Sequence, residues 1–538
     1  MKRTSFHRAR IAGILALALL CASVCLAATS GSISGTVKDP SGAVLPGVAL
    51  TLRNTALGTE FKTTTDASGY YSFPNLPVGN YDLTLQLPSF KTEKKAGIVV
   101  DMDSALQIDL SMEVAAENQS VTVSTSSPLE LVQVETVATH LGEVVSDTQM
   151  TALPLNGRSY TDLLAIQPGV SPVTTLTPTS VIMAGVTGTI NPSGDLNPGD
   201  VSIDGQRESA NGFMVDGIDV QEHMNGGTSV IPNLDSIQEF RVLTNNFDPE
   251  YGNYNGGMIN VVTKSGSNAF HGDAFEFLRN TDLDAKNYFA ATRGTFRQNQ
   301  FGGTLGGPVK HDKVFFFADY QGTRTNEGIT SPLTSVPTVQ DRDGNLADLA
   351  SSLTGTVSGS YLASVLDTQL GYAPGTLHQG EPYYMSGCSG PAQCVLPTLT
   401  LPESEWSAPA QHLLQYIPSP NIGTDLFSTS AFSETVRDDK LSGRIDANTH
   451  VGQFAGYYFL DNYRLDNPYP GQQGGASVPG FDALTIGQAQ LFSLGFTKLI
   501  GPDTVNELHI GVLRNANDIG EPHGGLGVSL ASQGFATG

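Results

Sequence analysis

The stretch Tyr251-Gly-Asn-Tyr-Asn-Gly-Gly-Met-Ile-Asn-Val-Val-Thr-Lys-Ser265 carries the most information about the fold. A glycine cluster runs into a short segment rich in β-branched residues, which is typical of a turn followed by a buried strand. Two apolar segments precede it, Phe213-Met-Val-Asp-Gly-Ile-Asp-Val220 and Ile237-Gln-Glu-Phe-Arg-Val-Leu243. The pair Asp216-Gly217 predicts a tight turn, because both residue types tolerate the backbone that such turns require.

In this order, the three segments resemble the plug domain of TonB-dependent outer-membrane receptors, a small domain lodged inside a large β-barrel. Leu153-Pro-Leu-Asn-Gly-Arg158, followed by Gln167-Pro-Gly169, resembles the Oar-like branch of that family. Where the family often has an Arg-Gly pair, Gly205-Gln-Arg207 stands here, so the resemblance supports the domain more than its single residues. It implies an α/β plug over residues 131–265. The plug motif residues are Asp216, Gly217, Gly252, Gly256 and Gly257, and the last three are expected to permit turns and close backbone approach to the barrel wall.

The first 28 residues have the pattern of a secretory signal peptide. A basic start precedes the apolar run Ile11–Leu20, and small residues follow at Ala27 and Ala28. The run is too short to span a bilayer, and no longer apolar run follows, so we expect export with no transmembrane helix. A lipid anchor is the less favoured alternative, because a leucine and a valine precede the two leader cysteines.

Residues 29–113 predict a β-sandwich. Short alternating segments are separated by turn sequences at about ten-residue spacing, including Asp39-Pro-Ser-Gly42 and Asp66-Ala-Ser-Gly69. The segment resembles the carboxypeptidase regulatory-like domain, a non-catalytic accessory module, so Asp66 and Gly69 are interpreted as turn formers. A carbohydrate-binding role for this domain is a weaker hypothesis, because it rests on fold form alone.

Residues 114–130 are too polar to form a core and are interpreted as a linker. In the receptor family, a short extended motif before the plug pairs with the periplasmic protein TonB. Val121, Thr122 and Val123 are the best candidates, because edge pairing needs only backbone groups in a β-prone segment. An ordinary linker strand and the first strand of the plug remain as alternatives.

Residues 266–538 alternate apolar and polar positions in runs of roughly ten residues with aromatic ends, which is typical of membrane barrel strands. Residues 325 to about 435 interrupt the pattern with Gly-, Pro-, Ser- and Thr-rich sequence, and they predict a long external loop with a short helix at Leu346–Leu353. Cys388 and Cys394 lie close together in this loop, which predicts a disulfide in an exported protein.

About seven candidate strands precede Gly538, whereas the family closes its barrel with about twenty-two. An open barrel edge in lipid leaves backbone groups unpaired, at several kcal/mol each. The sequence therefore predicts part of a large antiparallel transmembrane β-barrel, from a truncated product or a fragment. The fold class expected for the whole chain is mainly β: an N-terminal β-sandwich, a small α/β plug and the partial barrel.

No enzyme chemistry is predicted. The chain has no His-Glu-x-x-His helix, no Gly-x-Ser-x-Gly elbow and no P-loop, so no catalytic, cofactor or metal site is expected. The formal charge of −24, from 28 Lys+Arg against 52 Asp+Glu, argues against a nucleic-acid partner.

The resemblance implies a receptor in the cell outer membrane of a Gram-negative-type bacterium. Such a receptor binds an external ligand and imports it with energy relayed by TonB, so the implied partners are TonB, outer-membrane lipid and a ligand that the sequence does not identify. The alternative is a surface adhesion or scaffolding protein that keeps this architecture without active transport.

Overall fold

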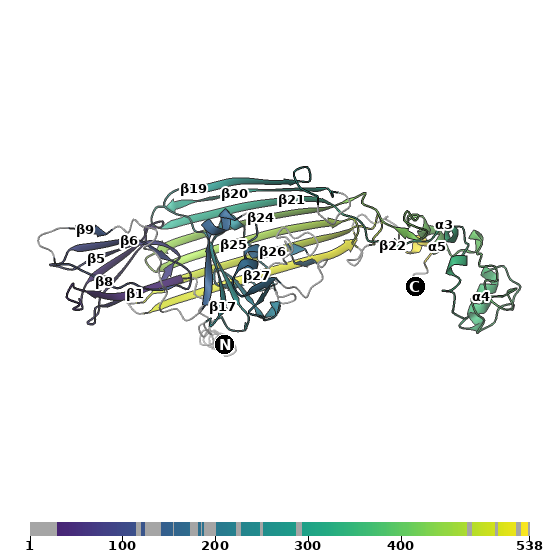
Figure 1. Cartoon of the computed structure of the whole chain (residues 1–538), viewed down its shortest axis with the longest axis horizontal. Coiled ribbons are helices and arrows are strands. Elements are labelled where there is room, and N and C mark those ends of the chain that lie inside the picture. The colour runs from purple at the N-terminus through teal and green to yellow at the C-terminus, as the bar shows by residue number, and fades with distance from the viewer. Residues whose placement is uncertain are drawn as a thin grey trace, which may run out of the picture.

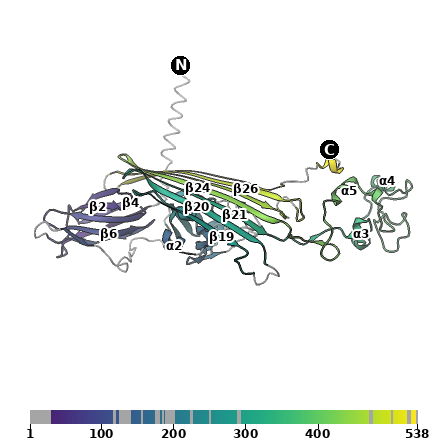
Figure 2. The ribbon, with the colours of Figure 1, turned by 90° about the horizontal axis from the view of Figure 1, so that it is seen from above.

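The computed structural model describes residues 30–114, 120–123, 141–153, 155, 157–172, 181–183, 186–187, 201–221, 227–247, 251–286, 293–470, 476–500, 504–522 and 529–535. The predicted signal peptide lies outside these residues. Strands dominate the described chain, as predicted for a mainly β protein. A β-sandwich lies at one end, a long sheet with the plug on one of its faces fills the middle, and a partly helical loop domain lies at the other end (Figures 1 and 2).

The first domain is the predicted sandwich. One sheet has the order β4-β1-β7 with β8 also on β1, and the other has the order β3-β2-β5-β6-β9. Strand β1 alternates half-buried and buried residues, because one face of each sheet covers the common core. Asp66 is a turn former: its Oδ1 accepts the backbone N–H of Ser68 and Tyr70, and Gly69 has φ +72°. The strands are β1 (Ser30–Lys38), β2 (Ala49–Asn54), β3 (Glu60–Thr64), β4 (Tyr70–Pro77), β5 (Gly79–Gln86), β6 (Thr92–Val100), β7 (Ala105–Gln107), β8 (Leu110–Ser111) and β9 (Ser120–Val123).

The plug is built on a mixed five-stranded sheet of order β10-β17-β18-β15-β16, in which only β15 and β18 are parallel. Helix α2 begins at Asp147, because Ser146 and Gln149 form a capping box there. A 3₁₀-helix, η1, follows at Tyr160–Ile166. The elements are β10 (Leu141–Ser146), α2 (Asp147–Ala152), η1 (Tyr160–Ile166), β11 (Val170–Pro172), β12 (Val181–Met183), β13 (Val186–Thr187), β14 (Val201–Ile203), η2 (Glu208–Ala210), β15 (Gly212–Val215), β16 (Ile218–Asp219), η3 (Leu234–Ser236), β17 (Ile237–Asn245) and β18 (Met258–Thr263).

The described residues hold seven long barrel strands, which form one antiparallel sheet in chain order. Most are longer than the predicted ten residues, because their hairpins extend beyond the apolar band that lipid requires. In this part of the chain, β19 and β27 each pair on one side only, so the sheet is not closed. The strands are β19 (His271–Asn280), β20 (Phe296–Lys310), β21 (Val314–Gly328), β24 (Ser433–Thr449), β25 (Gly452–Asn467), β26 (Ala483–Leu499) and β27 (Val505–Pro522).

The two faces of this sheet differ as membrane barrel strands require. Tyr458, Phe492 and Val512 are cross-strand neighbours on the outer face, and all three are exposed. Their neighbours Tyr457 and Phe459 point inward and are buried in the same apolar cluster as the plug core. None of the described helices is long and apolar enough to cross a membrane.

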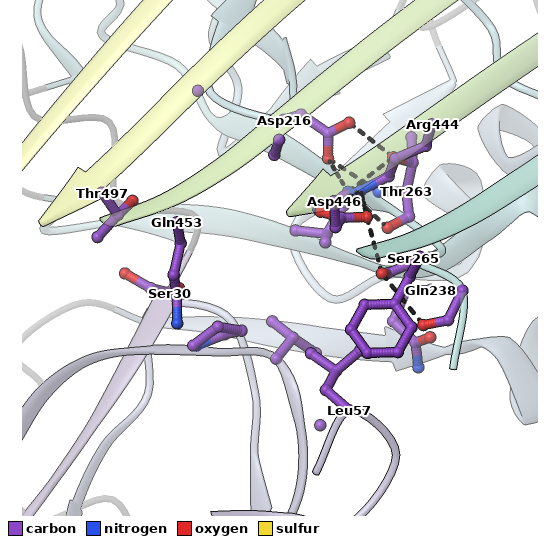
Figure 3. A pocket seen from close by; sticks show the side chains of 18 of the residues that line it. Ser30, Leu57, Asp216, Gln238, Thr263, Ser265, Arg444, Asp446, Gln453 and Thr497 are labelled. Carbon is purple, nitrogen blue, oxygen red and sulfur yellow. Dashed lines mark hydrogen bonds and ion pairs between the residues drawn. The ribbon is translucent and has the colours of Figure 1, made fainter. Parts of the chain in front are cut away.

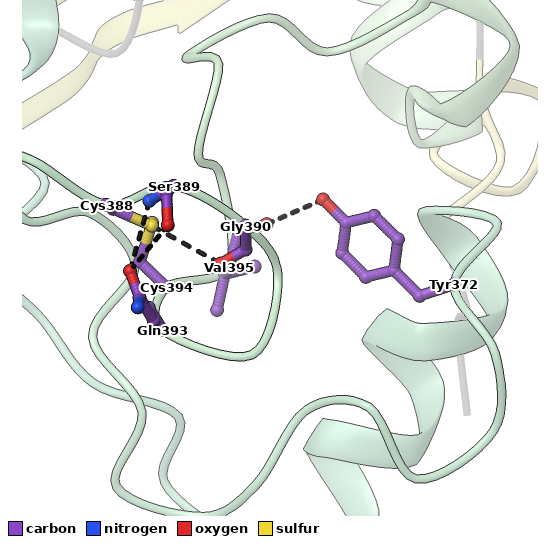
Figure 4. Close-up of a disulfide and its surroundings, with 7 residues drawn as sticks. All are labelled: Tyr372, Cys388, Ser389, Gly390, Gln393, Cys394 and Val395. Atoms are coloured by element: carbon purple, nitrogen blue, oxygen red, sulfur yellow. Dashed lines mark hydrogen bonds between the residues drawn. A yellow bond between two sulfur atoms is a disulfide. The ribbon is translucent and has the colours of Figure 1, made fainter.

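The predicted external loop folds as a small domain between β21 and β24. The helix expected at Leu346–Leu353 is only the 3₁₀ turn η5, because the backbone of Leu346 pairs with Leu399 instead. The structure joins Cys388 and Cys394 in a disulfide near Tyr372, whose hydroxyl donates to the Val395 carbonyl at 2.9 Å (Figure 4). The elements are β22 (Thr334–Ser335), α3 (Val339–Arg342), η5 (Ala347–Leu349), α4 (Ser360–Gln369), η6 (Glu403–Glu405), α5 (Ala408–Leu414) and β23 (Leu426–Phe427), and η7 (Ala531–Gln533) contacts α5.

Candidate functional site

The plug meets the barrel wall at Arg444 of β24 (Figure 3). Its Nη1 lies 3.2 Å from Asp216 Oδ1 and donates to the Thr263 carbonyl at 2.9 Å, while its Nε lies 3.0 Å from Asp446 Oδ2. The predicted tight turn forms at Asp216-Gly217, with φ +47° and +78°, between β15 and β16. Asp216 therefore has two roles: its backbone forms the turn, and its carboxylate pairs with Arg444 of the barrel.

A second polar contact lies on the neighbouring strand. Asp319 of β21 accepts hydrogen bonds from the plug residue Asn233 and from Ser442 of β24. All three residues are buried. A buried carboxylate is tolerated only when it is hydrogen-bonded, so this contact ties the plug to two barrel strands.

The predicted motif Leu153–Arg158 reaches the barrel through its last two residues. Arg158 pairs with Asp235 inside the plug, and its guanidinium carbon lies 4.2 Å from the ring centroid of Phe277 on β19. Gln300 of β20 donates to the Gly157 carbonyl at 3.0 Å. These contacts place the motif against the first two barrel strands.

The expectation that the plug-motif glycines approach the barrel wall is wrong for Gly256 and Gly257. A Cβ on Gly256 would lie 2.3 Å from Asn211 Oδ1, and one on Gly257 would lie 2.4 Å from Ile203 Cδ1, so both pack inside the plug. Gly252 lies in a turn. Close approach to the barrel backbone occurs just after the plug, at Gly266, where a Cβ would lie 2.3 Å from the Phe316 carbonyl oxygen.

The first domain also contacts the plug, through the backbone of Met102 and the side chain of Asp103. The N–H of Met102 donates to Glu239 Oε1, and its carbonyl accepts from Arg241 Nη1, both at 2.6 Å. Tyr251 adds a 2.6 Å hydrogen bond to Asp103 Oδ2. Burial raises the pKa of Glu239 to about 8. Sequence reasoning did not predict this contact.

A cavity of about 430 Å³ lies where the first domain, the plug and the barrel meet (Figure 3). Leu57 of the first domain, Gln238 and Ser265 of the plug, and Arg444 and Gln453 of the barrel contribute to its wall. Three separate parts of the chain therefore enclose the same space. In the described ranges, no group of three or more His, Cys, Asp or Glu residues is placed to hold a metal ion.

The candidate TonB-contact residues, Val121 to Val123, lie in β9, which pairs in parallel with Thr92–Lys95 of β6. The segment interpreted as a linker therefore contributes an edge strand to the first domain's second sheet. Residues 120–123 are therefore not the first strand of the plug sheet.

Arg444 and Asp319 were missed by sequence reasoning, although a signal was present. Both are charged residues at inward positions of alternating strands: Arg444 shares its side of β24 with the buried Ser442, and Asp319 lies between the buried Phe317 and Gln321. A charge on the inward side of a barrel strand next to a plug needs a partner, and the plug is the nearest source of one.

Two family models match the chain. The one described as "Outer membrane beta barrel domain" matches residues 262–538, which is about half of the chain, and the one described as "Carboxypeptidase regulatory-like domain" matches residues 32–113. Among curated proteins, the TonB-dependent transporter Oar of Myxococcus xanthus is 28% identical over 331 residues, which cover 58% of this chain. The matched region spans only 29% of that relative's length.

Solved structures of outer-membrane proteins also align with the chain, at low scores. The outer membrane transporter YddB from Escherichia coli aligns with 11% identity and a TM-score of 0.31, covering 70% of this chain and 48% of that one. The siderophore receptor PirA from Acinetobacter baumannii aligns with 14% identity and a TM-score of 0.31, covering 72% and 49%.

Proposed function

Because the chain belongs to the outer-membrane β-barrel family, as an Oar-like TonB-dependent receptor, we propose that it binds an external ligand and imports it with energy relayed by TonB. It would carry out no bond chemistry. A mechanical pull on the plug would be converted into release of a bound ligand and opening of a path along the barrel wall.

One observation supports this proposal most directly: the plug is held on the sheet by discrete polar contacts beside an apolar cluster. Arg444 and Asp319 each bridge the plug and the wall. Water can replace such hydrogen bonds when the plug moves, because hydrogen bonds to charged groups contribute only about 1.5–3 kcal/mol each beyond their aqueous equivalents. A plug seated in this way can be displaced in steps without unfolding the wall.

We further propose that TonB pairs with Val121, Thr122 and Val123. Strand β9 lies last in its sheet, so one of its edges has no partner strand among the described residues. An incoming extended segment can add there by main-chain hydrogen bonds. Because β9 precedes the plug in the chain, a pull applied to it would be directed along the chain toward the plug.

The test is site-specific photo-crosslinking in outer membranes that contain TonB. A photoreactive residue at position 121, 122 or 123 is expected to crosslink to TonB. The matched control is position 62, because Lys62 lies on β3, the opposite edge strand of the same sheet, and is exposed. Equal crosslinking from both edges, or none from β9, would reject the TonB contact.

The rival function is adhesion or scaffolding without transport, which the folded loop domain at the far end of the sheet favours (Figure 1). Deleting residues 120–125 separates the two functions. Uptake should be lost if the receptor is a transporter, whereas cell-surface attachment should persist if it is an adhesin.

A further inference from the structure

The loop domain contains a cavity of its own, of about 950 Å³, at the opposite end of the sheet from the first domain (Figure 1). Its walls come from α3, η5 and α5 and from the segment around Trp406. A volume of this order accommodates a small organic molecule. The cavity is separate from the plug contacts, so its chemistry can be considered independently of transport.

Hydrogen bonds hold the cavity walls in place. The N–H of Leu346 donates to the Leu399 carbonyl and the N–H of Leu401 to the Gly344 carbonyl, each at 2.8 Å. On another side, Arg342 Nη2 donates to the Ile417 carbonyl at 2.9 Å, which ties α3 to the segment after α5. A ligand entering this cavity would meet walls already formed, which lowers the ordering cost of binding.

The lining combines apolar side chains with carboxylates. The apolar side includes Leu346, Leu349, Leu401 and Leu414. The charged side chains that line it are Asp341, Asp348 and Asp425, and no Lys, Arg or His joins them.

One of these carboxylates is hydrogen-bonded through only one of its oxygens. Asp341 Oδ2 accepts the N–H of Thr338 at 2.9 Å, whereas its Oδ1 is buried without a hydrogen-bond partner. This oxygen is closed off from solvent, so the Asp341 carboxylate would act on a ligand in the cavity through its charge rather than through a direct bond from Oδ1.

We propose that this cavity binds a small organic cation, with an amine or guanidinium head among Asp341, Asp348 and Asp425 and an apolar body along the leucines and Trp406. Charge complementarity selects the head, because three carboxylates without a cation repel an anionic ligand and attract a cationic one. The apolar lining selects the body, because a fully hydrated ion would leave that surface exposed to water.

Trp406 gives a direct readout of binding. It is the single tryptophan of the chain, and its indole N–H donates to the Leu401 carbonyl at 3.0 Å, which fixes the ring at the cavity wall. A cation near this ring gains further attraction from the aromatic face. When excited at wavelengths longer than those that tyrosine absorbs, Trp406 alone fluoresces, so its emission reports on occupancy of this cavity.

The experiment titrates the full chain in detergent with phenethylammonium and, separately, with 2-phenylethanol, which shares the apolar body but carries no charge. The expected result is a saturable change in Trp406 emission with the amine and a far weaker response to the alcohol. Equal affinity for both would overturn the charge selection, and no saturable response to the amine would overturn the site.

Variants test the carboxylates. Asp341→Asn together with Asp348→Asn is expected to weaken amine binding about tenfold, and Asp348→Asn alone about threefold, because each substitution removes one attractive charge but keeps an oxygen acceptor. Asp343→Asn is the control, because this exposed aspartate ends α3 but does not line the cavity.

The single substitution keeps the test valid if the double variant misfolds, since Asp348 is exposed and its described side-chain contact is one 3.3 Å bond from Thr338. Unchanged affinity in Asp348→Asn, or equal weakening in Asp343→Asn, would reject the proposed head site. None of these measurements involves TonB, so they can fail while the transport proposal stands.

Discussion

Replacing Arg444 by methionine should loosen the plug from the barrel. The substitution keeps an unbranched stem but removes the guanidinium, and it leaves Asp216 and Asp446 without their shared cation. Breaking a buried ion pair by removing one partner costs about 3–5 kcal/mol. The Arg444 side chain is 17% exposed, so solvent screens part of the ion-pair energy. We therefore take the lower figure of about 3 kcal/mol.

The assay is the rate of maleimide labelling of a cysteine introduced at Leu491, which is fully buried in the cluster shared by the plug and barrel. Labelling requires the plug to move away, so the rate follows the opening equilibrium. A cost of about 3 kcal/mol predicts labelling about 100-fold faster in the Arg444→Met background. Cys388 and Cys394 do not compete, because they are disulfide-bonded.

Arg437→Met is the matched control on the same strand. Arg437 pairs with Asp439 at 2.8 Å, but its side chain is 65% exposed, and exposed ion pairs contribute about 0–1 kcal/mol. Its effect on labelling should therefore stay within a few-fold. If Arg444→Met labelled no faster than Arg437→Met in a folded barrel, the plug would not depend on this ion pair and the reasoning would be refuted.

The contact between the first domain and the plug should weaken as pH rises from about 4.5 to about 8. Burial raises the pKa of Glu239 to about 8, so the buried side chain favours the protonated form, whereas the exposed side chain has already lost its proton in this pH range. Glu239→Gln keeps the acceptor for the Met102 N–H and should remove this pH dependence. The measurement is the rate of protease cleavage of the 101–104 segment at pH 6 and pH 9. The same pH dependence in both proteins would contradict the role given to Glu239. Gly266→Ala should destabilise the chain by about 1–3 kcal/mol, because its Cβ would meet the Phe316 carbonyl. Gly443→Ala meets nothing within 4 Å and should leave the thermal midpoint unchanged, so equal losses in both variants would argue against a specific clash.

Local patterns in the sequence predicted the barrel strands and the tight turn at Asp216-Gly217. Side chains along a strand point alternately to its two faces, so the apolar pattern identifies outward residues such as Phe492 without knowledge of the strands beside them. Asp-Gly similarly encodes its turn within a few residues. These features need no information about distant parts of the chain.

The contacts between domains could not be predicted in this way. Arg444 and Asp216 are 228 residues apart, and Arg241 and Met102 are 139 residues apart. Such pairs depend on how whole sheets are placed against one another. The same limit explains why β9 was interpreted as a linker, since its partner strand β6 is identified only by the folded first domain.

The alternation of β25 makes this strand tolerant of one kind of genetic change and intolerant of another. Tyr457 and Phe459 seat the plug, whereas Tyr458 between them faces outward. A substitution at any one position alters a single surface. Deletion of one codon upstream in the strand would turn every following side chain to the opposite face. The residues that pack against the plug would then face lipid, and the residues that face lipid would then meet the plug. Single-codon insertions and deletions in these strands should therefore be far more damaging than missense changes at the same sites.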